Sequence, residues 1–192
     1  YCQPGGNYIV GYTAYDGFDA WCPFLFNHFW YIPTAAIQID FGIVDYGDVV
    51  ECVWQTSAGG DDDMNTPSLP TVKNIGNTPV TLTVEQDHMG FGQTDGNWNV
   101  EFQARMNVDG AYTGPYWPDM ETPIPGVLEM CTQDKLDFQI HVIKGIPGGV
   151  ANMGTMCLTA YIDGIPNDWP KYLPFDPAPT NIPQNILSYY SP

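Results

Sequence analysis

The sequence predicts an all-β protein, an antiparallel β-sandwich of the jelly-roll or immunoglobulin-like kind with an extended arm at each end. Three observations support this class. Eighteen prolines and twenty glycines are spread through the 192 residues, which leaves little room for long helices. Aromatic residues, which favour strands, make up 14% of the chain. Several short segments alternate apolar and polar residues, as a strand with one buried face does.

The clearest strand signals lie between residues 80 and 162. In each of four segments, every second residue is apolar and the residues between are polar or small. We expect these apolar faces to meet in the core of the sandwich. The faces are Val80, Leu82 and Val84; Trp98, Val100, Phe102 and Ala104; Leu136, Phe138, Ile140 and Val142; and Met156, Leu158, Ala160 and Ile162.

Weaker signals place the remaining elements and the domain boundaries. Residues 37–41 and 49–54 are expected as short strands around a turn at 45–48, and residues 59–70 as a loop. An aromatic, proline-interrupted N-terminal arm is expected over 1–36 and the sandwich domain over 37–162. A proline-rich C-terminal arm is expected over 163–192, where seven prolines exclude central strands.

The charge of the chain excludes one large class of partner. Asp and Glu total 22 against five Lys and Arg, giving a formal net charge of −17. Such a surface repels nucleic acid, whose binding depends on basic side chains. Membrane insertion is not expected either, because the most apolar run, 20–32, is short and contains Pro23, Asn27 and His28.

The cysteines point to a secreted protein with disulfides. They show no zinc-ligand spacing, and the chain opens at Tyr1 without a methionine, which we interpret as a mature N-terminus left by processing. An extracellular, cell-surface location is therefore expected, where disulfides persist. The count is odd, so at least one thiol stays free or bonds another chain. The disulfide candidates are Cys2, Cys22, Cys52, Cys131 and Cys157, and the sequence does not choose their pairing.

Three stretches carry a resemblance to a known family. They are IDFGIVDYGDVVECVW (39–54), LPTVKNIGNTPVTLTV (69–84) and KLDFQIHVIKGIPGGVANMGTMCLTAYI (135–162). The first two resemble the glycine and Lys-Asn pattern of camelysin and TasA-like secreted β-sandwich proteins, and the third resembles their closing strands. The resemblance implies a sandwich and, through relatives in archaeal envelope filaments, tubules and methanogen sheaths, an envelope subunit. The cysteines and the aromatic arm depart from the bacterial members and fit a covalently reinforced sheath better.

No catalytic constellation is visible, and we expect that the protein is not an enzyme. His28, His88 and His141 lie far apart in the sequence without a metalloprotease spacing, and the serine nucleophile motif G-x-S-x-G is absent. A Cys-His pair of Cys131 or Cys157 with His141 is less expected than structural disulfides in a secreted chain.

Two sets of residues are candidates for binding. Asp61, Asp62 and Asp63 are carboxylates of the kind that calcium prefers, but a solvated acidic loop is the more expected explanation, because the EF-hand spacing is absent. No other cofactor is expected. The apolar residues of the N-terminal arm are the candidates for subunit contact, because such a patch marks an interface. They are Phe24, Phe26, Phe29, Trp30 and Ile32.

The sequence thus favours a structural subunit that polymerises with itself into an extracellular sheath, tubule or filament. Two apolar arms, a charged fraction of 14% and the odd cysteine support this reading. The alternative is a secreted adhesion module that binds carbohydrate or calcium, in which aromatic residues such as Trp21, Trp30 and Trp117 stack on sugars.

Overall fold

The computed structural model describes residues 3–12, 14, 25–57, 59–107, 110–145 and 152–163, and within these ranges the regular elements are all strands. The described residues fall into two compact units. The first comprises residues 3–4 and 33–163 and is the sandwich. The second comprises residues 5–12, 14 and 25–32 and is a hairpin.

The larger sheet of the sandwich is built around β11 (Gln133–Val142), its longest strand. β9 (Val100–Met106) pairs with one edge of β11 in antiparallel register, from Leu136↔Met106 to Val142↔Val100. Two short strands share the opposite edge: β5 (Thr71–Asn74) pairs with the start of β11 and β4 (Trp54–Thr56) with its end. β3 (Ile37–Ile39) then pairs with β5.

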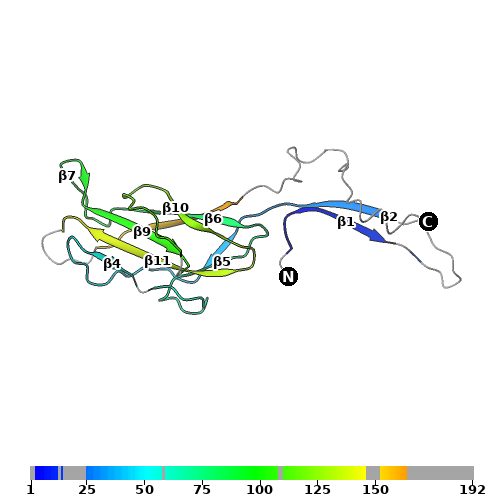
Figure 1. Cartoon of the computed structure of the whole chain (residues 1–192), viewed down its shortest axis with the longest axis horizontal. Coiled ribbons are helices and arrows are strands. Elements are labelled where there is room, and N and C mark those ends of the chain that lie inside the picture. Colours follow the sequence, from blue (N-terminus) through cyan, green and yellow to red (C-terminus); the bar gives the residue numbers. More distant parts are fainter. Residues whose placement is uncertain are drawn as a thin grey trace. The chain divides into compact units, whose positions relative to one another are not determined.

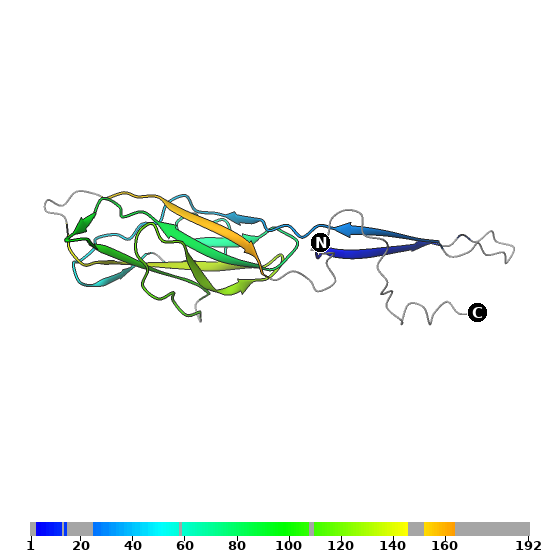
Figure 2. The same ribbon diagram turned by 90° about the horizontal axis from the view of Figure 1, so that it is seen from above.

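The second sheet has three strands, with β6 (Val80–Gln86) in the middle. β12 (Met156–Ile162) pairs with β6 over seven residues without interruption. β10 (Thr122–Leu128) pairs with its other edge through a bulge between Ile124 and Leu128. In Figure 2, β12 is the orange strand beside the green β6, and the yellow-green β11 belongs to the other layer.

The core lies between these two sheets, which confirms the predicted antiparallel sandwich. The apolar faces expected in β6 and β11, and that of β9 from Val100 onward, are buried, because a period of two sends alternate side chains to one face. The fully buried members include Val80, Leu82, Val84, Val100, Phe102, Ala104, Leu136, Phe138 and Ile140. The face expected in β12 is only partly buried, and Ile162 at its end is exposed. Figure 1 shows β9 and β11 side by side in one layer, with β6 and β10 in the other.

The second unit is a hairpin within the segment expected as the N-terminal arm. β1 (Gly6–Tyr12) and β2 (Leu25–Tyr31) form an antiparallel hairpin whose register runs from Gly6↔Tyr31 to Tyr12↔Leu25. Neither strand contains proline, so every residue keeps the backbone donor that pairing needs. The interruptions expected from Pro4, Pro23 and Pro33 lie outside the paired segments.

Several sequence predictions were wrong at the level of single elements. Residues 49–54 are not a strand: Val53 N donates to Val50 O in a turn, Cys52 adopts a φ of 62°, and β4 begins only at Trp54. Trp98 does not continue the core face of β9, because it belongs to a small ribbon of β7 (Gln93–Thr94) and β8 (Asn97–Trp98). β10 was missed because of its two prolines, which it accommodates as a bulged strand.

The predicted C-terminal arm lies outside the described residues, apart from Asp163. Among the described residues there is no helix long and apolar enough to span a membrane.

Candidate functional site

An apolar groove opens on one side of the sandwich, between the edge strands of its two sheets. Among the described strands, β3 pairs only with β5 and β12 pairs only with β6. Each strand therefore presents an unpaired backbone edge toward this side, and such edges are templates for pairing with another strand. The groove between them has a volume of about 780 Å³.

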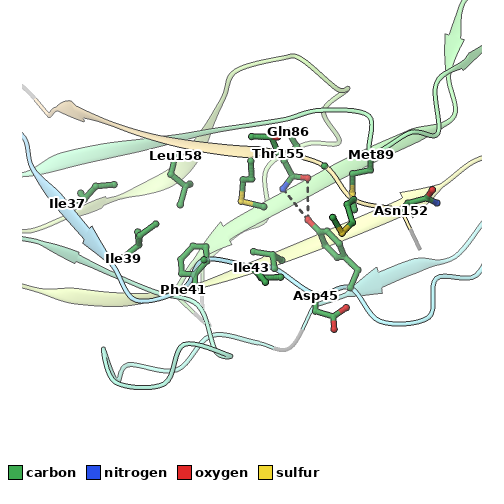
Figure 3. Close-up of a pocket in the computed structure, with 16 residues that line it drawn as sticks. Ile37, Ile39, Phe41, Ile43, Asp45, Gln86, Met89, Asn152, Thr155 and Leu158 are labelled. Atoms are coloured by element: carbon green, nitrogen blue, oxygen red, sulfur yellow. Dashed lines mark hydrogen bonds between the residues drawn. The ribbon is translucent and has the colours of Figure 1, made fainter. Parts of the chain in front are cut away.

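The lining of the groove is mostly apolar, and its polar side chains are Asp45, the one charged group, with Gln86, Asn152 and Thr155. Figure 3 shows Ile37 and Ile39 of β3 on one wall, Leu158 of β12 on the other, and Phe41 beyond Ile39. The apolar side chains that line it are Ile37, Ile39, Phe41, Ile43, Val44, Tyr46, Met89, Met153, Met156 and Leu158. A surface of this size and composition is typical of a site that another apolar group covers.

Two buried aromatic residues, Phe41 and Tyr46, form the floor of the groove. The Phe41 ring lies 6.2 Å from that of Phe138, and the Tyr46 ring lies 6.5 Å from that of Phe102. Gln86 Nε2 donates a hydrogen bond to the Tyr46 hydroxyl at 3.1 Å. Burial raises the pKa of Tyr46 above its ordinary value. The floor is therefore continuous with the core of the sandwich.

Tyr46 reaches this position from the predicted turn. Asp45 Oδ1 accepts a hydrogen bond from Gly47 N at 2.8 Å, and Gly47 has a φ of 66°, which glycine adopts without strain. This turn leaves Tyr46 only 6% exposed. A residue that the sequence places in a turn is thus part of the core.

The far rim of the groove is held by Asp87. Its two carboxylate oxygens accept hydrogen bonds from Met89 N and Thr155 N, each at 2.8 Å. Between these contacts lies Gly154, where a Cβ atom would collide with the Asp87 carboxylate and with Met89. The segment that leads into β12 is therefore fixed in place, and the groove has a defined wall.

The core is incompletely covered along this groove. Ile37, Met156 and Leu158 pack against core residues yet remain only partly buried. Ile39 is 44% exposed, and Ile43 and Met153 are exposed to 80% and 86%.

The hairpin presents apolar side chains on both of its faces. Phe29 lies opposite Tyr8, whose ring is stacked on it at 5.4 Å, while Phe26 lies on the other face because it is three residues away. Phe26, Phe29 and Ile32, three of the predicted contact residues, are exposed to 45%, 46% and 55%. Trp30 is half-buried, and Phe24 lies outside the described residues.

The structure places Asp61, Asp62 and Asp63 in a loop, residues 59–70, that precedes β5 at one edge of the larger sheet. Asp61 Oδ1 accepts a hydrogen bond from Asp63 N at 3.0 Å, and Asp63 Oδ1 accepts one from Asn65 N at 2.9 Å. Within the described ranges, no three acidic, histidine or cysteine side chains are grouped to hold a metal ion. Asp61 and Asp63 thus cap turns of their own loop.

Three of the five cysteines lie in the described residues. Cys52 and Cys157 are free and exposed, and Cys131 is disulfide-bonded. Cys157 pairs with Glu85 on the outer face of the β6 sheet, whereas His141 belongs to the other sheet, so the Cys157–His141 pair considered from the sequence does not form. Cys2 and Cys22 are not among the described residues.

A second cluster of side chains lies on the outer face of the larger sheet. The Trp54 and His141 rings are stacked 4.9 Å apart, and His141 Nδ1 lies 2.8 Å from Glu101 Oε1. On the same face, the Arg105 guanidinium lies 4.6 Å from the centre of the Tyr112 ring. This face combines flat rings with polar groups, which the sequence analysis did not single out because the residues come from three strands and a loop.

Comparison with known proteins adds nothing to this geometry: no family model, no curated protein and no solved structure matches the chain.

Sequence reasoning missed the groove, although one signal for it was present. Ile37, Ile39, Phe41 and Ile43 alternate with a period of two, which indicates a continuous apolar face that runs beyond the end of β3. Gln86, Met89 and Met153 carried no such signal, because they reach the groove from the end of β6 and the segment before β12.

Proposed function

We propose that this protein is a structural subunit that polymerises with itself into an extracellular sheath, tubule or filament of the cell envelope. The observation that carries the proposal is the pair of uncovered apolar surfaces in one chain, the groove between β3 and β12 and the β1–β2 hairpin. A chain with two such surfaces joins a partner through each of them and so forms an open chain of subunits. The resemblance to camelysin and TasA-like proteins of envelope filaments supports the same function.

The charge distribution supports association through these two surfaces. The described hairpin strands contain no Asp, Glu, Lys or Arg, and the groove contains only Asp45. In a chain of net charge −17, contact through uncharged surfaces brings subunits together without setting carboxylates against each other. Carboxylates elsewhere still repel, so we expect salt or calcium to promote assembly.

The test is the size and appearance of the purified full chain over a range of protein concentrations. We expect concentration-dependent polymers by light scattering and regular assemblies by electron microscopy. A double variant, Val10→Ser with Phe29→Ser, removes two exposed apolar side chains from one hairpin face and should block assembly. The matched control, Val50→Ser with Val53→Ser, changes exposed side chains that do not line the groove and should assemble normally. A monomer at every concentration, with or without calcium, would contradict the proposal.

A second candidate function is a secreted adhesion module that binds carbohydrate. The stacked Trp54 and His141 rings, with Glu101 beside them, favour it, because aromatic faces flanked by polar groups suit sugar rings. Binding to a panel of immobilised glycans, lost in Trp54→Ala and kept in Val127→Ala on the other sheet, would support this function. Calcium binding by Asp61, Asp62 and Asp63 is tested by titration calorimetry with the triple Asn variant as control.

A further inference from the structure

Cys131 is disulfide-bonded, and the other cysteines of the chain restrict the identity of its partner. Cys52 and Cys157 are free thiols. The chain has five cysteines, so within one chain only Cys2 and Cys22 remain as partners. The choice between these two depends on which of them the chain path brings to Cys131.

Cys131 lies in the turn between β10 and β11, beside the place where the chain enters the sandwich. The next residue, Thr132, accepts a hydrogen bond at its carbonyl oxygen from Asn74 N at 2.9 Å. Asn74 ends β5 and is paired with Ile37, the first residue of β3. The segment that leads from the hairpin into β3 therefore ends close to Cys131.

The hairpin register separates the two candidate cysteines. At one end of the hairpin Gly6 pairs with Tyr31, and Leu25 marks the other end, six residues before Tyr31 on β2, a distance of about 20 Å. The chain continues to β3 from the Gly6–Tyr31 end. In the sequence, Cys2 comes shortly before Gly6, whereas Cys22 comes shortly before Leu25. Cys2 therefore precedes the hairpin end that connects to the sandwich, and Cys22 adjoins the opposite end.

The division of the chain into two units favours the same cysteine. Gln3 and Pro4 belong to the sandwich unit, whereas residues 5–12 and 25–32 belong to the hairpin unit. One peptide unit joins Cys2 to Gln3, which sets their Cα atoms about 3.8 Å apart. A disulfide needs Cα atoms within about 7 Å of each other. Cys2 is thus the candidate whose chain neighbour already lies in the same unit as Cys131.

We propose that Cys2 and Cys131 form a disulfide within one chain and that Cys22 stays outside this bond. The inference goes beyond the proposed function and does not depend on polymerisation. Each of the two thiols gives up one proton and one electron as the sulfur–sulfur bond forms. The electrons and protons pass by thiol–disulfide exchange to another disulfide, small-molecule or protein, which is reduced to two thiols.

This disulfide attaches the hairpin to the sandwich at the start of β1 as well as at the end of β2. The end of β2 is attached through the segment at 32–36, where Thr34 N donates to Asn77 Oδ1. β1 begins at Gly6, shortly after Cys2, so the bond ties its start to the turn before β11. Load on the hairpin in a polymer then reaches the sandwich through both strands.

The first experiment maps the bond in the wild-type chain. Oxidised protein is denatured without reductant at acidic pH, labelled with a maleimide and cleaved before aspartate. Asp16 and Asp19 place Cys2 and Cys22 in different peptides. Mass spectrometry should find the Cys2 and Cys131 peptides joined, with no maleimide on either. A joined Cys22–Cys131 pair, or maleimide on Cys131, would overturn the inference.

Two matched triple variants test the same assignment independently. Both replace the exposed Cys52 and Cys157 with serine, and the first adds Cys22→Ser where the second adds Cys2→Ser. The first variant should take up no maleimide when denatured and run as a monomer on a non-reducing gel, and the second should take up two. Equal uptake in both variants would count against the proposed pair. A dimer of the first variant that reductant dissolves would show that the bond joins two chains, which also overturns the inference.

Discussion

Arg105 and Asp137 form an ion pair on the outer face of the larger sheet, with Nε 2.8 Å from Oδ2. They face each other across β9 and β11, whose register sets Asp137 directly opposite Arg105. The second carboxylate oxygen of Asp137 accepts a hydrogen bond from Gly60 N at 2.9 Å. The Asp137 side chain thus connects the acidic loop of residues 59–70 to the larger sheet.

Substitution Asp137→Ala should therefore destabilise the sandwich. The Asp137 side chain is nearly buried, and its loss removes the acceptor of the hydrogen bonds from Arg105 Nε and Gly60 N. Because Arg105 is partly exposed to water, we expect a loss of about 2 kcal/mol in the free energy of unfolding. Urea unfolding measures it, with Gln103→Ala on the same face of β9 as a control that stays near wild type. An unchanged unfolding midpoint in Asp137→Ala would show that the ion pair is not stabilising.

Glycine is required at position 154 and dispensable at position 114. A Cβ at Gly154 would collide with the Asp87 carboxylate, which holds the groove rim, whereas a Cβ at Gly114 meets nothing within 4 Å. We expect Gly154→Ala to cost about 1–3 kcal/mol in stability, as overpacking does. Gly114→Ala should be neutral or slightly stabilising. Thermal unfolding of both variants measures this. Equal changes in stability would show that the groove rim shifts at no cost to accommodate a methyl group at position 154.

The charged Asp134 side chain should make the protein less stable at neutral pH than an asparagine at the same position would. Burial first, and then the nearby Asp62 carboxylate, raise the pKa of Asp134 above its ordinary value of 3.8. The folded state therefore binds this proton more tightly than the unfolded state, and the contribution to stability falls as pH rises from 3.8 through the raised pKa.

The substitution Asp134→Asn should remove that loss, because an amide oxygen still accepts the hydrogen bond from Lys135 N. We expect the variant to be more stable than wild type at neutral pH and to lose the advantage below the ordinary aspartate pKa. Urea unfolding at both pH values measures this, with Asp95→Asn in an exposed turn as the isosteric control. A variant less stable than wild type at neutral pH would show that ionised Asp134 does not destabilise the folded protein.

A disulfide between subunits is expected in the assembled protein. Cys52 and Cys157 are free and exposed, and the odd number of cysteines leaves at least one thiol without a partner in its own chain. The sequence favours Cys2 or Cys22 for the cross-link, and among the described thiols Cys157 is our candidate, since it projects from the exposed face of the edge strand β12.

Denaturing gels without reductant should then show oligomers that collapse to monomer when reductant is added. Single Cys→Ser variants identify the residue, because only its loss abolishes the ladder. Monomer in both lanes would end this prediction and leave the exposed thiols without a role in cross-linking.

The local pattern of the chain was sufficient to predict the centre of the sandwich. In β6, β9 and β11, the alternation of residues such as Leu82, Phe102 and Phe138 with polar neighbours assigned both the strand and its buried face. This succeeds because side-chain direction in a strand depends only on residue parity. The exposure of Phe26, Phe29 and Ile32 could also be predicted from the sequence, because an isolated domain cannot bury so many apolar side chains from one terminal segment.

Tertiary pairing decided the rest. Whether β10 forms despite Pro123 and Pro125, and whether Tyr46 of a turn becomes core, depends on partners far along the chain, such as β6 and Gln86. The groove itself exists because two strands, β3 and β12, end up as the edges of different sheets with no described strand between them. An edge is a property of the assembled sheet and not of the strand's own residues, so the alternation that determined the core carried no information about where the core would be left open.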